Sequence, residues 1–147
     1  MWQKWSGLIG LGLILSYSAG VLAAASSALS MEAALKAAQV AVSDCQGKGH
    51  AVSAAVVDAG GRLLVLLRSD EAGPHTVDSS YRKAYTALSL RRPTHELART
   101  VAKDPELQAL HNVSDDILIL GGGLPIRTGG KVVGGIGVGG APGAMLD

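Results

Sequence analysis

Residues 52–68, VSAAVVDAGGRLLVLLR, contain the pattern that decides the fold. Two apolar runs, Val52–Asp58 and Arg62–Arg68, suit buried strands, and the first is rich in valine. The segment Asp58-Ala59-Gly60-Gly61 between them is a turn signal. The stretch therefore predicts a β-hairpin.

Helical patterns lie on both sides of this hairpin. Ser30–Gly47 predicts a helix with Ser30 as its N-cap, and its apolar residues recur at helical spacing in one stripe that we expect to face the core: Met31, Ala34, Leu35, Ala38, Val42 and Cys45. Thr76–Leu90 predicts a second helix, stopped by Pro93, with an apolar face of Val77, Tyr81, Ala84, Tyr85 and Leu88. Shorter helices are predicted from Thr94 to Val101 and from Asp104 onward.

The C-terminal third is a glycine-rich series of short apolar runs. Ile117–Leu120 predicts a short strand, and a hairpin is predicted around Gly129-Gly130, from Leu124 to Val138. The order is helix, hairpin, helices and meander. It predicts an α+β domain in which helices cover an antiparallel sheet.

The N-terminus has the three parts of a secretory signal. Lys4 precedes an uncharged apolar run, Gly7–Leu22, and small residues follow it. We expect cleavage after Ala23 or Ala25, giving a signal peptide at 1–25 and one domain at 26–147 that is periplasmic or secreted. A retained N-terminal anchor is the alternative. After cleavage we expect no membrane span, because the apolar run leaves with the signal.

Charge and cysteine content exclude two further classes. The formal net charge is +1 and falls to about zero once Lys4 is removed, so no basic field is available to hold nucleic acid. Cys45 is the only cysteine, which excludes an internal disulfide. It lies on the apolar stripe of the first helix, so we expect a buried thiol. An intermolecular bridge is the alternative.

Few motifs in the sequence indicate catalysis. Gly135, Gly137 and Gly140 match G-x-G-x-x-G, but a dinucleotide site needs a following helix, and seven residues follow Gly140. We expect these glycines to allow close backbone packing. The chain contains no paired zinc-ligand motif and no G-x-S-x-G elbow, so the spacing of its residues does not by itself indicate an enzyme. His75 stands out among the histidines because it precedes an amphipathic helix.

Four blocks, taken in order, resemble the GlcG/HbpS-like family, which includes secreted and periplasmic haem-binding proteins and the C-terminal domain of PduO. They are Ala55-Val56-Val57-Asp58-x-x-Gly61, Arg82-Lys83-Ala84-Tyr85-Thr86-Ala87, Gly121-Gly122-Gly123-Leu124-Pro125-Ile126 and Gly134-Gly135-Ile136-Gly137-Val138-Gly139-Gly140-Ala141-Pro142. The resemblance covers about Ser30 to Asp147. It implies a profilin-like α+β fold, with an antiparallel sheet of about five strands flanked by helices, and assembly into a homo-oligomer.

The resemblance also implies a haem (tetrapyrrole) site. His75 lies just before the helix that matches the family's K-A-x-T-A pattern, and it is the candidate axial ligand to the iron. Lys83, Arg82 and Arg68 are candidates for pairing with the propionates. Thr86, from the same K-A-x-T-A pattern, completes the expected cofactor-binding set.

Three functions follow from these features. The first is an exported haem binder, acting as a carrier or sensor. The second is an enzyme or accessory protein that binds a small carboxylate such as glycolate, with Arg68 and Lys83 as anchors. The third is a structural oligomer without a ligand.

The chain departs from the family pattern at two places. The family usually continues into a final helix, whereas this sequence ends at Asp147. If that helix is absent, part of the sheet is uncovered, which favours oligomerisation. Gly139 stands where the family often has serine, which removes one hydroxyl.

Overall fold

A computed structural model describes residues 28–142, so the predicted signal peptide at 1–25 and its cleavage site lie outside the described residues. The elements are α1 (Met31–Gly47), β1 (Ser53–Asp58), β2 (Leu63–Arg68), α2 (His75–Ser89), α3 (Thr94–Lys103), the 3₁₀ helix η1 (Pro105–Asn112), β3 (Gly123–Thr128) and β4 (Lys131–Gly139). Among the described residues no helix has the length and apolar character needed to cross a membrane. The predicted α+β class and both hairpins are confirmed.

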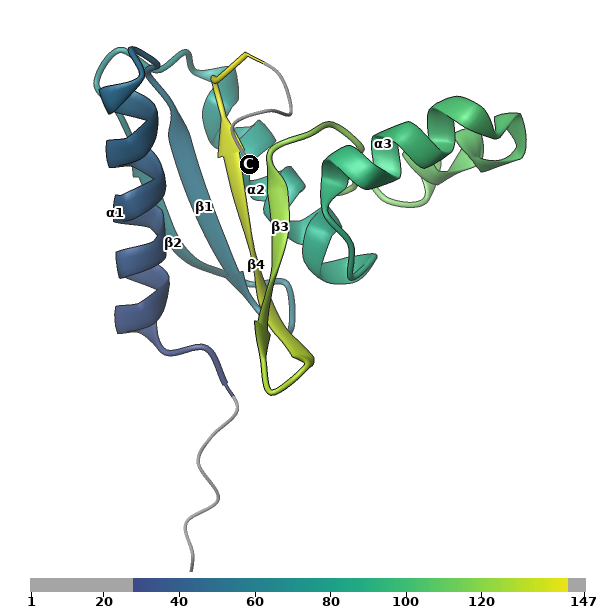
Figure 1. The fold of residues 1–147 in the computed structure, drawn as a ribbon, viewed down its shortest axis with the longest axis horizontal. Helices are drawn as coiled ribbons and strands as arrows, with labels where there is room; N and C mark the ends of the chain where they lie inside the picture. The colour runs from purple at the N-terminus through teal and green to yellow at the C-terminus, as the bar shows by residue number, and fades with distance from the viewer. Residues whose placement is uncertain (1–27, 143–147) are drawn as a thin grey trace, which may run out of the picture.

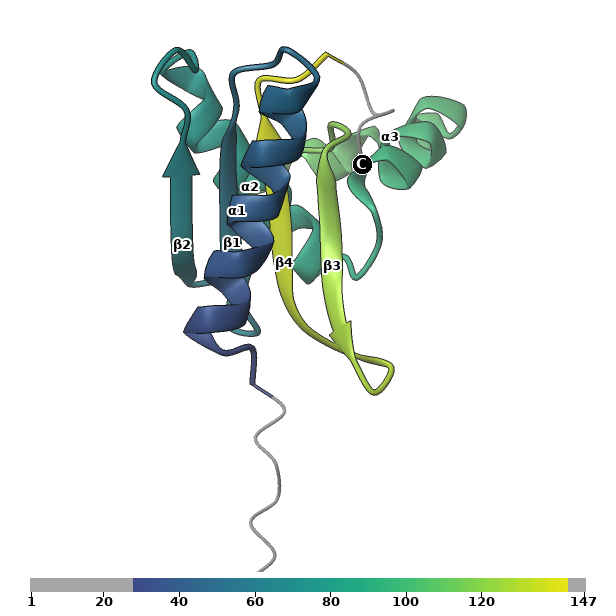
Figure 2. The same cartoon turned by 60° about the vertical axis from the view of Figure 1, so that its left-hand side comes forward.

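The strands form one antiparallel sheet in the order β2-β1-β4-β3. Helix α1 covers one face and α2 covers the other, so the body has three layers (Figures 1 and 2). The sheet has four strands within the described residues, where about five were expected.

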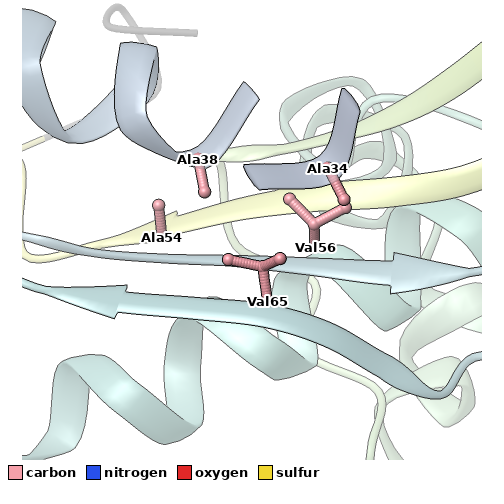
Figure 3. Close-up of a cluster of buried hydrophobic side chains, with 5 residues drawn as sticks. All are labelled: Ala34, Ala38, Ala54, Val56 and Val65. Atoms are coloured by element: carbon pink, nitrogen blue, oxygen red, sulfur yellow. The ribbon is translucent and has the colours of Figure 1, made fainter. Parts of the chain in front are cut away.

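The first core cluster lies between α1 and the sheet. Ala34 and Ala38 of α1 pack on Ala54, Val56 and Val65 of the hairpin (Figure 3). The Ser30 hydroxyl accepts a hydrogen bond from the Ala33 amide at 3.2 Å, which confirms the predicted N-cap. Cys45 is buried, as expected.

Met31 is a correction to the predicted stripe of α1. Its side chain is 62 % exposed, because it occupies the first residue of the helix rather than a position over the sheet.

Helix α2 lies close to β4 because alternate residues on that face of the strand are glycines. A Cβ placed on Gly135, Gly137 or Gly139 would come within 2.2–2.8 Å of a backbone oxygen of α2. The glycines therefore allow close backbone packing, as the sequence predicted. The face of α2 that meets them consists of small residues, with Thr76, Ser80 and Ala84 at four-residue intervals.

This contact corrects the predicted face of α2. Of its five predicted residues only Ala84 is buried, while Val77, Tyr81, Tyr85 and Leu88 are half-buried. Large apolar side chains cannot lie between two backbones in direct contact, so they lie along the flanks of the helix.

Residues 94–122 form a lobe that extends away from the sheet beyond β3 (Figure 1). Its core is a second cluster of Leu97, Val101, Ile117 and Ile119, against which Tyr85 and Leu90 of α2 pack. The predicted strand at 117–120 is wrong, because this segment is irregular. Its two buried isoleucines face the lobe core, and its backbone bonds to side chains of α2 instead of to a neighbouring strand.

Candidate functional site

A cavity of about 380 Å³ lies where the lobe meets the body of the protein. Its lining residues come from α2, from α3, from the segment before β3 and from the residue after Gly140: Lys83, His95, Ala98, Arg99, Ala102, Leu120, Gly121 and Ala141. We call this cavity the Lys83 pocket. Three of its lining residues are basic and none is acidic, so the pocket is suited to an anionic ligand.

Helix α3 forms one wall of this pocket with one of its faces, while another face packs in the lobe core. Residues 95, 98, 99 and 102 share one helical face and line the cavity. Leu97 and Val101 lie on another face and are buried in the lobe core. The helix therefore holds His95 and Arg99 on the same side, together with Ala98 and Ala102.

Lys83 lies at the inner end of the pocket and is only 6 % exposed. Its Nζ donates a hydrogen bond to the Val138 carbonyl oxygen at 3.0 Å. An ammonium group has three donors, and a buried charge is tolerated only where polar or charged partners compensate its lost hydration. Lys83 therefore places its amino group at the pocket as a candidate partner for an anionic ligand.

Arg99 supplies a second positive charge, nearer the solvent. Its side chain is exposed, and it takes part in none of the ion pairs formed among residues 28–142. Leu120, at the rim, is 55 % exposed. The pocket thus combines basic groups with an apolar edge, which is the combination that an amphipathic anion requires.

Of the five predicted site residues, only Lys83 lines this pocket. His75 is the first residue of α2 and is exposed, eight residues along the helix from Lys83. Arg68 ends β2, and its Nε donates to the Ala72 carbonyl oxygen at 3.0 Å, so its guanidinium holds the loop between β2 and α2. His75 and Arg68 remain predicted ligand contacts that the structure does not bring to Lys83.

Arg82 and Thr86 contact the lobe. Arg82 Nη2 donates to the Ile117 carbonyl oxygen at 3.0 Å, and its Nη1 lies 3.5 Å from the Asp78 carboxylate. Thr86 is fully buried, and its hydroxyl accepts from the Leu118 amide at 2.8 Å. Both side chains thus hold the segment that leads to Leu120.

Sequence reasoning missed His95 and Arg99. His95 stands beside Glu96 near the start of a predicted helix, a pattern that is typical of a solvated surface. The available signal was the spacing of 95, 98, 99 and 102, which puts a histidine and an arginine on one helical face. What the spacing does not reveal is that this face turns toward Lys83.

A second cavity, of about 400 Å³, lies near the loops that follow α1 and β2. It is lined by Gln46, Gly49, His50, Ala51, Ser69, Asp70 and Glu71. Within the described part of the chain, no group of three or more His, Cys, Asp or Glu side chains is placed so that it could hold a metal ion. The Lys83 pocket is the stronger candidate site.

A family model described as "Haem degrading protein HbpS-like" matches residues 29–146. The chain belongs to the HbpS-like family. The resemblance found in the four sequence blocks is thereby confirmed. Protein GlcG of Escherichia coli is 33 % identical over 95 residues, which are 65 % of this chain and 69 % of GlcG.

Two solved structures are similar to this chain in fold and sequence. A crystal structure of a Streptomyces reticuli HbpS double mutant is 41 % identical with a TM-score of 0.75, covering 99 % of this chain and 91 % of that one. A crystal structure of a PduOC–haem complex is 28 % identical with a TM-score of 0.74, covering 81 % of this chain and 87 % of that one. This HbpS-like chain therefore shares its fold with a protein crystallised with haem.

The family's K-A-x-T-A pattern now has a physical explanation in this chain. Lys83 reaches the pocket, Ala84 lets α2 lie against Gly135, and Thr86 holds the lobe. Ala87 is fully buried. The four named positions of the pattern therefore make four different contacts from one helix.

Proposed function

We propose that this HbpS-like protein is an exported haem-binding protein, a carrier or sensor, and that haem binds at the Lys83 pocket. The observation that carries the proposal is the presence of an imidazole, two cationic side chains and apolar surface around one cavity. The family membership and the related PduOC–haem structure support the choice of haem over other amphipathic anions. Export is proposed from the N-terminal sequence alone.

The residues of the pocket fit the chemistry of haem. A neutral imidazole is a common axial ligand to haem iron, and His95 is the histidine that lines this pocket. The propionates carry the negative charge that Lys83 and Arg99 can pair with. Ala98 and Leu120 provide apolar contact for the porphyrin. Haem, when bound, would supply an iron centre for redox chemistry or ligand exchange.

His75 is retained as the alternative iron ligand. His75 and His95 form a matched pair, because each is the first or second residue of its helix and each lies in a described, folded region. Replacing either histidine removes one imidazole near a helix start. The two variants therefore separate the ligand predicted from the sequence from the one that the pocket suggests.

The test is a haem titration of the purified protein followed by Soret absorbance, beside His95→Ala and His75→Ala. We expect a saturable, red-shifted band that His95→Ala abolishes and His75→Ala retains. Loss in His75→Ala alone would keep haem binding and assign the iron ligand to His75. Absence of saturable binding at micromolar haem in the unchanged protein would refute the proposed function.

Arg99→Gln tests the proposed propionate contact without disturbing the fold. The side chain is exposed and makes no ion pair among residues 28–142, so we expect an unchanged melting temperature. An exposed ion pair contributes about 0.2–1 kcal/mol, so haem should bind about 1.4- to fivefold more weakly. An affinity equal to that of the unchanged protein would remove Arg99 from the site.

A small carboxylate such as glycolate is the second candidate ligand, and a pocket lining with three basic residues and no acidic residue favours it. It would use Lys83 and Arg99 as anchors and would need no imidazole ligand. Isothermal titration with glycolate distinguishes the two ligands. The third possibility, a structural oligomer without a ligand, predicts no binding in either titration.

A further inference from the structure

The lobe leaves the body and returns to it at one fixed place. It begins after Pro93 and ends at Gly121-Gly122, just before Gly123 begins β3. The Thr94 hydroxyl is fully buried and bonds to both backbone groups of Gly123, accepting from its amide at 2.9 Å and lying 3.4 Å from its carbonyl oxygen. These bonds hold the two ends of the lobe together at its base. The position of the segment that leads back to β3 therefore depends on other contacts.

That return segment, residues 113–122, contains no helix or strand, yet it supplies Leu120 and Gly121 to the wall of the Lys83 pocket. Ile117 and Ile119 anchor it by burying their side chains in the lobe core. Apolar burial is non-directional and does not fix the rotation of the backbone. The polar groups of this backbone still need partners.

Helix α2 provides partners for both polar groups of one peptide unit. The Ile117 carbonyl oxygen and the Leu118 amide belong to the same peptide plane, and they bind Arg82 Nη2 at 3.0 Å and Thr86 Oγ1 at 2.8 Å respectively. Arg82 and Thr86 are one helical turn apart. Hydrogen bonds to both the carbonyl oxygen and the amide of one peptide plane fix the orientation of that plane. They therefore also fix the direction in which the chain continues to Leu120.

The hydroxyl proton of Thr86 points in a fixed direction, which makes its oxygen a defined acceptor for the Leu118 amide. Thr86 Oγ1 also lies 2.7 Å from the Arg82 carbonyl oxygen, to which it donates. Its own proton is thus committed within the helix, which leaves an oxygen lone pair for the Leu118 amide. Thr86 and Arg82 do not line the Lys83 pocket, so they can affect a ligand there only through the wall they hold.

We propose that Thr86, together with Arg82, is a positioning residue that fixes the 113–122 wall of the Lys83 pocket and thereby sets ligand affinity. The effect on affinity rests on the proposed function. The effect on the wall does not, because the contacts exist in the protein without a ligand.

The first arm of the test is amide hydrogen exchange of the purified, ligand-free protein. Thr86→Val keeps the side-chain shape and removes the acceptor, Thr86→Ser restores it, and Ser80→Ala is the control. Ser80 is also fully buried on α2, but its hydroxyl bonds only to Val77 within the helix, at 2.9 Å.

Loss of one ordinary hydrogen bond changes an opening equilibrium about fivefold. We therefore expect exchange across 113–122 to accelerate about fivefold in Thr86→Val, with no change there in Thr86→Ser or Ser80→Ala. Unchanged exchange in Thr86→Val, or an equal acceleration in Ser80→Ala, would overturn the positioning role.

The second arm is haem dissociation from the same variants. We expect Thr86→Val to weaken haem binding about fivefold at an unchanged Soret position, and Thr86→Ser to rescue it. A Soret shift without faster exchange would instead indicate direct contact with the ligand and overturn the proposal. If the unchanged protein binds no haem, the proposed function fails, while the exchange arm still decides whether Thr86 holds the wall. Faster exchange with unaltered haem affinity would overturn the link between wall and ligand.

Discussion

Gly137→Ala is the substitution that tests the central contact of this fold most directly. A Cβ at this position would lie 2.2 Å from the Ser80 carbonyl oxygen, 2.5 Å from the Ala84 amide nitrogen and 3.0 Å from the Lys83 Cβ. Gly137 does not have a positive φ, so its backbone conformation accepts alanine without strain. The whole cost of the substitution is therefore steric.

The distances set the size of that cost. A carbon atom approaches a carbonyl oxygen to about 3.3 Å, so α2 would have to retreat from β4 by about 1 Å. A gap of this size forfeits about a quarter to a half of the dispersion energy along the contact. Overpacking usually costs about 1–3 kcal/mol, and because backbone cannot rotate away we expect at least about 3 kcal/mol. For a domain of this size that lowers the melting temperature by roughly 10 °C.

The assay is urea and thermal unfolding followed by circular dichroism, with Gly47→Ala as the matched control. Gly47 ends α1, and a Cβ there would have no neighbour within 4 Å. Removing the flexibility of that glycine should stabilise the protein by about 0.5 kcal/mol. A Gly137→Ala protein within about 0.5 kcal/mol of the unchanged protein would refute the reasoning, since backbone contact between α2 and β4 could not then be as close as described.

Two further predictions concern single residues outside the pocket. Arg91 follows α2 with φ 55°, a backbone conformation that costs a non-glycine residue about 1 kcal/mol. We therefore expect Arg91→Gly to raise the midpoint of urea unfolding. A lowered midpoint would contradict this prediction. Burial raises the pKa of the Cys45 thiol, Asp44 adds to the rise and Lys48 opposes it, so a thiol reagent at pH 8 should react slowly until urea unfolds the protein. Because the pKa is higher in the folded state, the thiol's contribution to stability is complete below the ordinary thiol pKa and is lost as pH rises through the folded value. Fast labelling of the folded protein would contradict the burial of Cys45.

Local patterns predicted the elements well because their signals are local. Ser30 caps α1 through the bond to Ala33, and the turn after Asp58 forms where its carboxylate accepts from the backbone of Gly60 and Arg62. Ile117–Leu120 was misassigned because a short apolar run does not reveal whether its partner is a strand or a helix. The partner here is the face of α3 with Leu97 and Val101, together with two polar side chains of α2.

The Lys83 pocket was harder to predict than the helices and strands because it depends on residues distant in the chain. His75 adjoins the K-A-x-T-A helix in sequence and stays a predicted iron ligand, but it does not line this pocket. Residues of the Lys83 pocket come from positions 83, 95–102, 120–121 and 141, which only the folding of the lobe brings together. The composition of each segment is unremarkable by itself, so no local rule could have selected them.

Two glycines also leave room for the Lys83 side chain to reach the Lys83 pocket. A Cβ on Gly122 would lie 3.1 Å from the Lys83 Nζ and 3.4 Å from its Cδ, and a Cβ on Gly137 would lie 3.0 Å from its Cβ. Two glycines from different segments thus bound the path of the lysine side chain from α2 to the pocket. The glycine-rich blocks and the lysine of the K-A-x-T-A pattern are therefore parts of one arrangement. Larger residues in those blocks would displace the lysine, and with it the basic group on which the proposed haem binding relies.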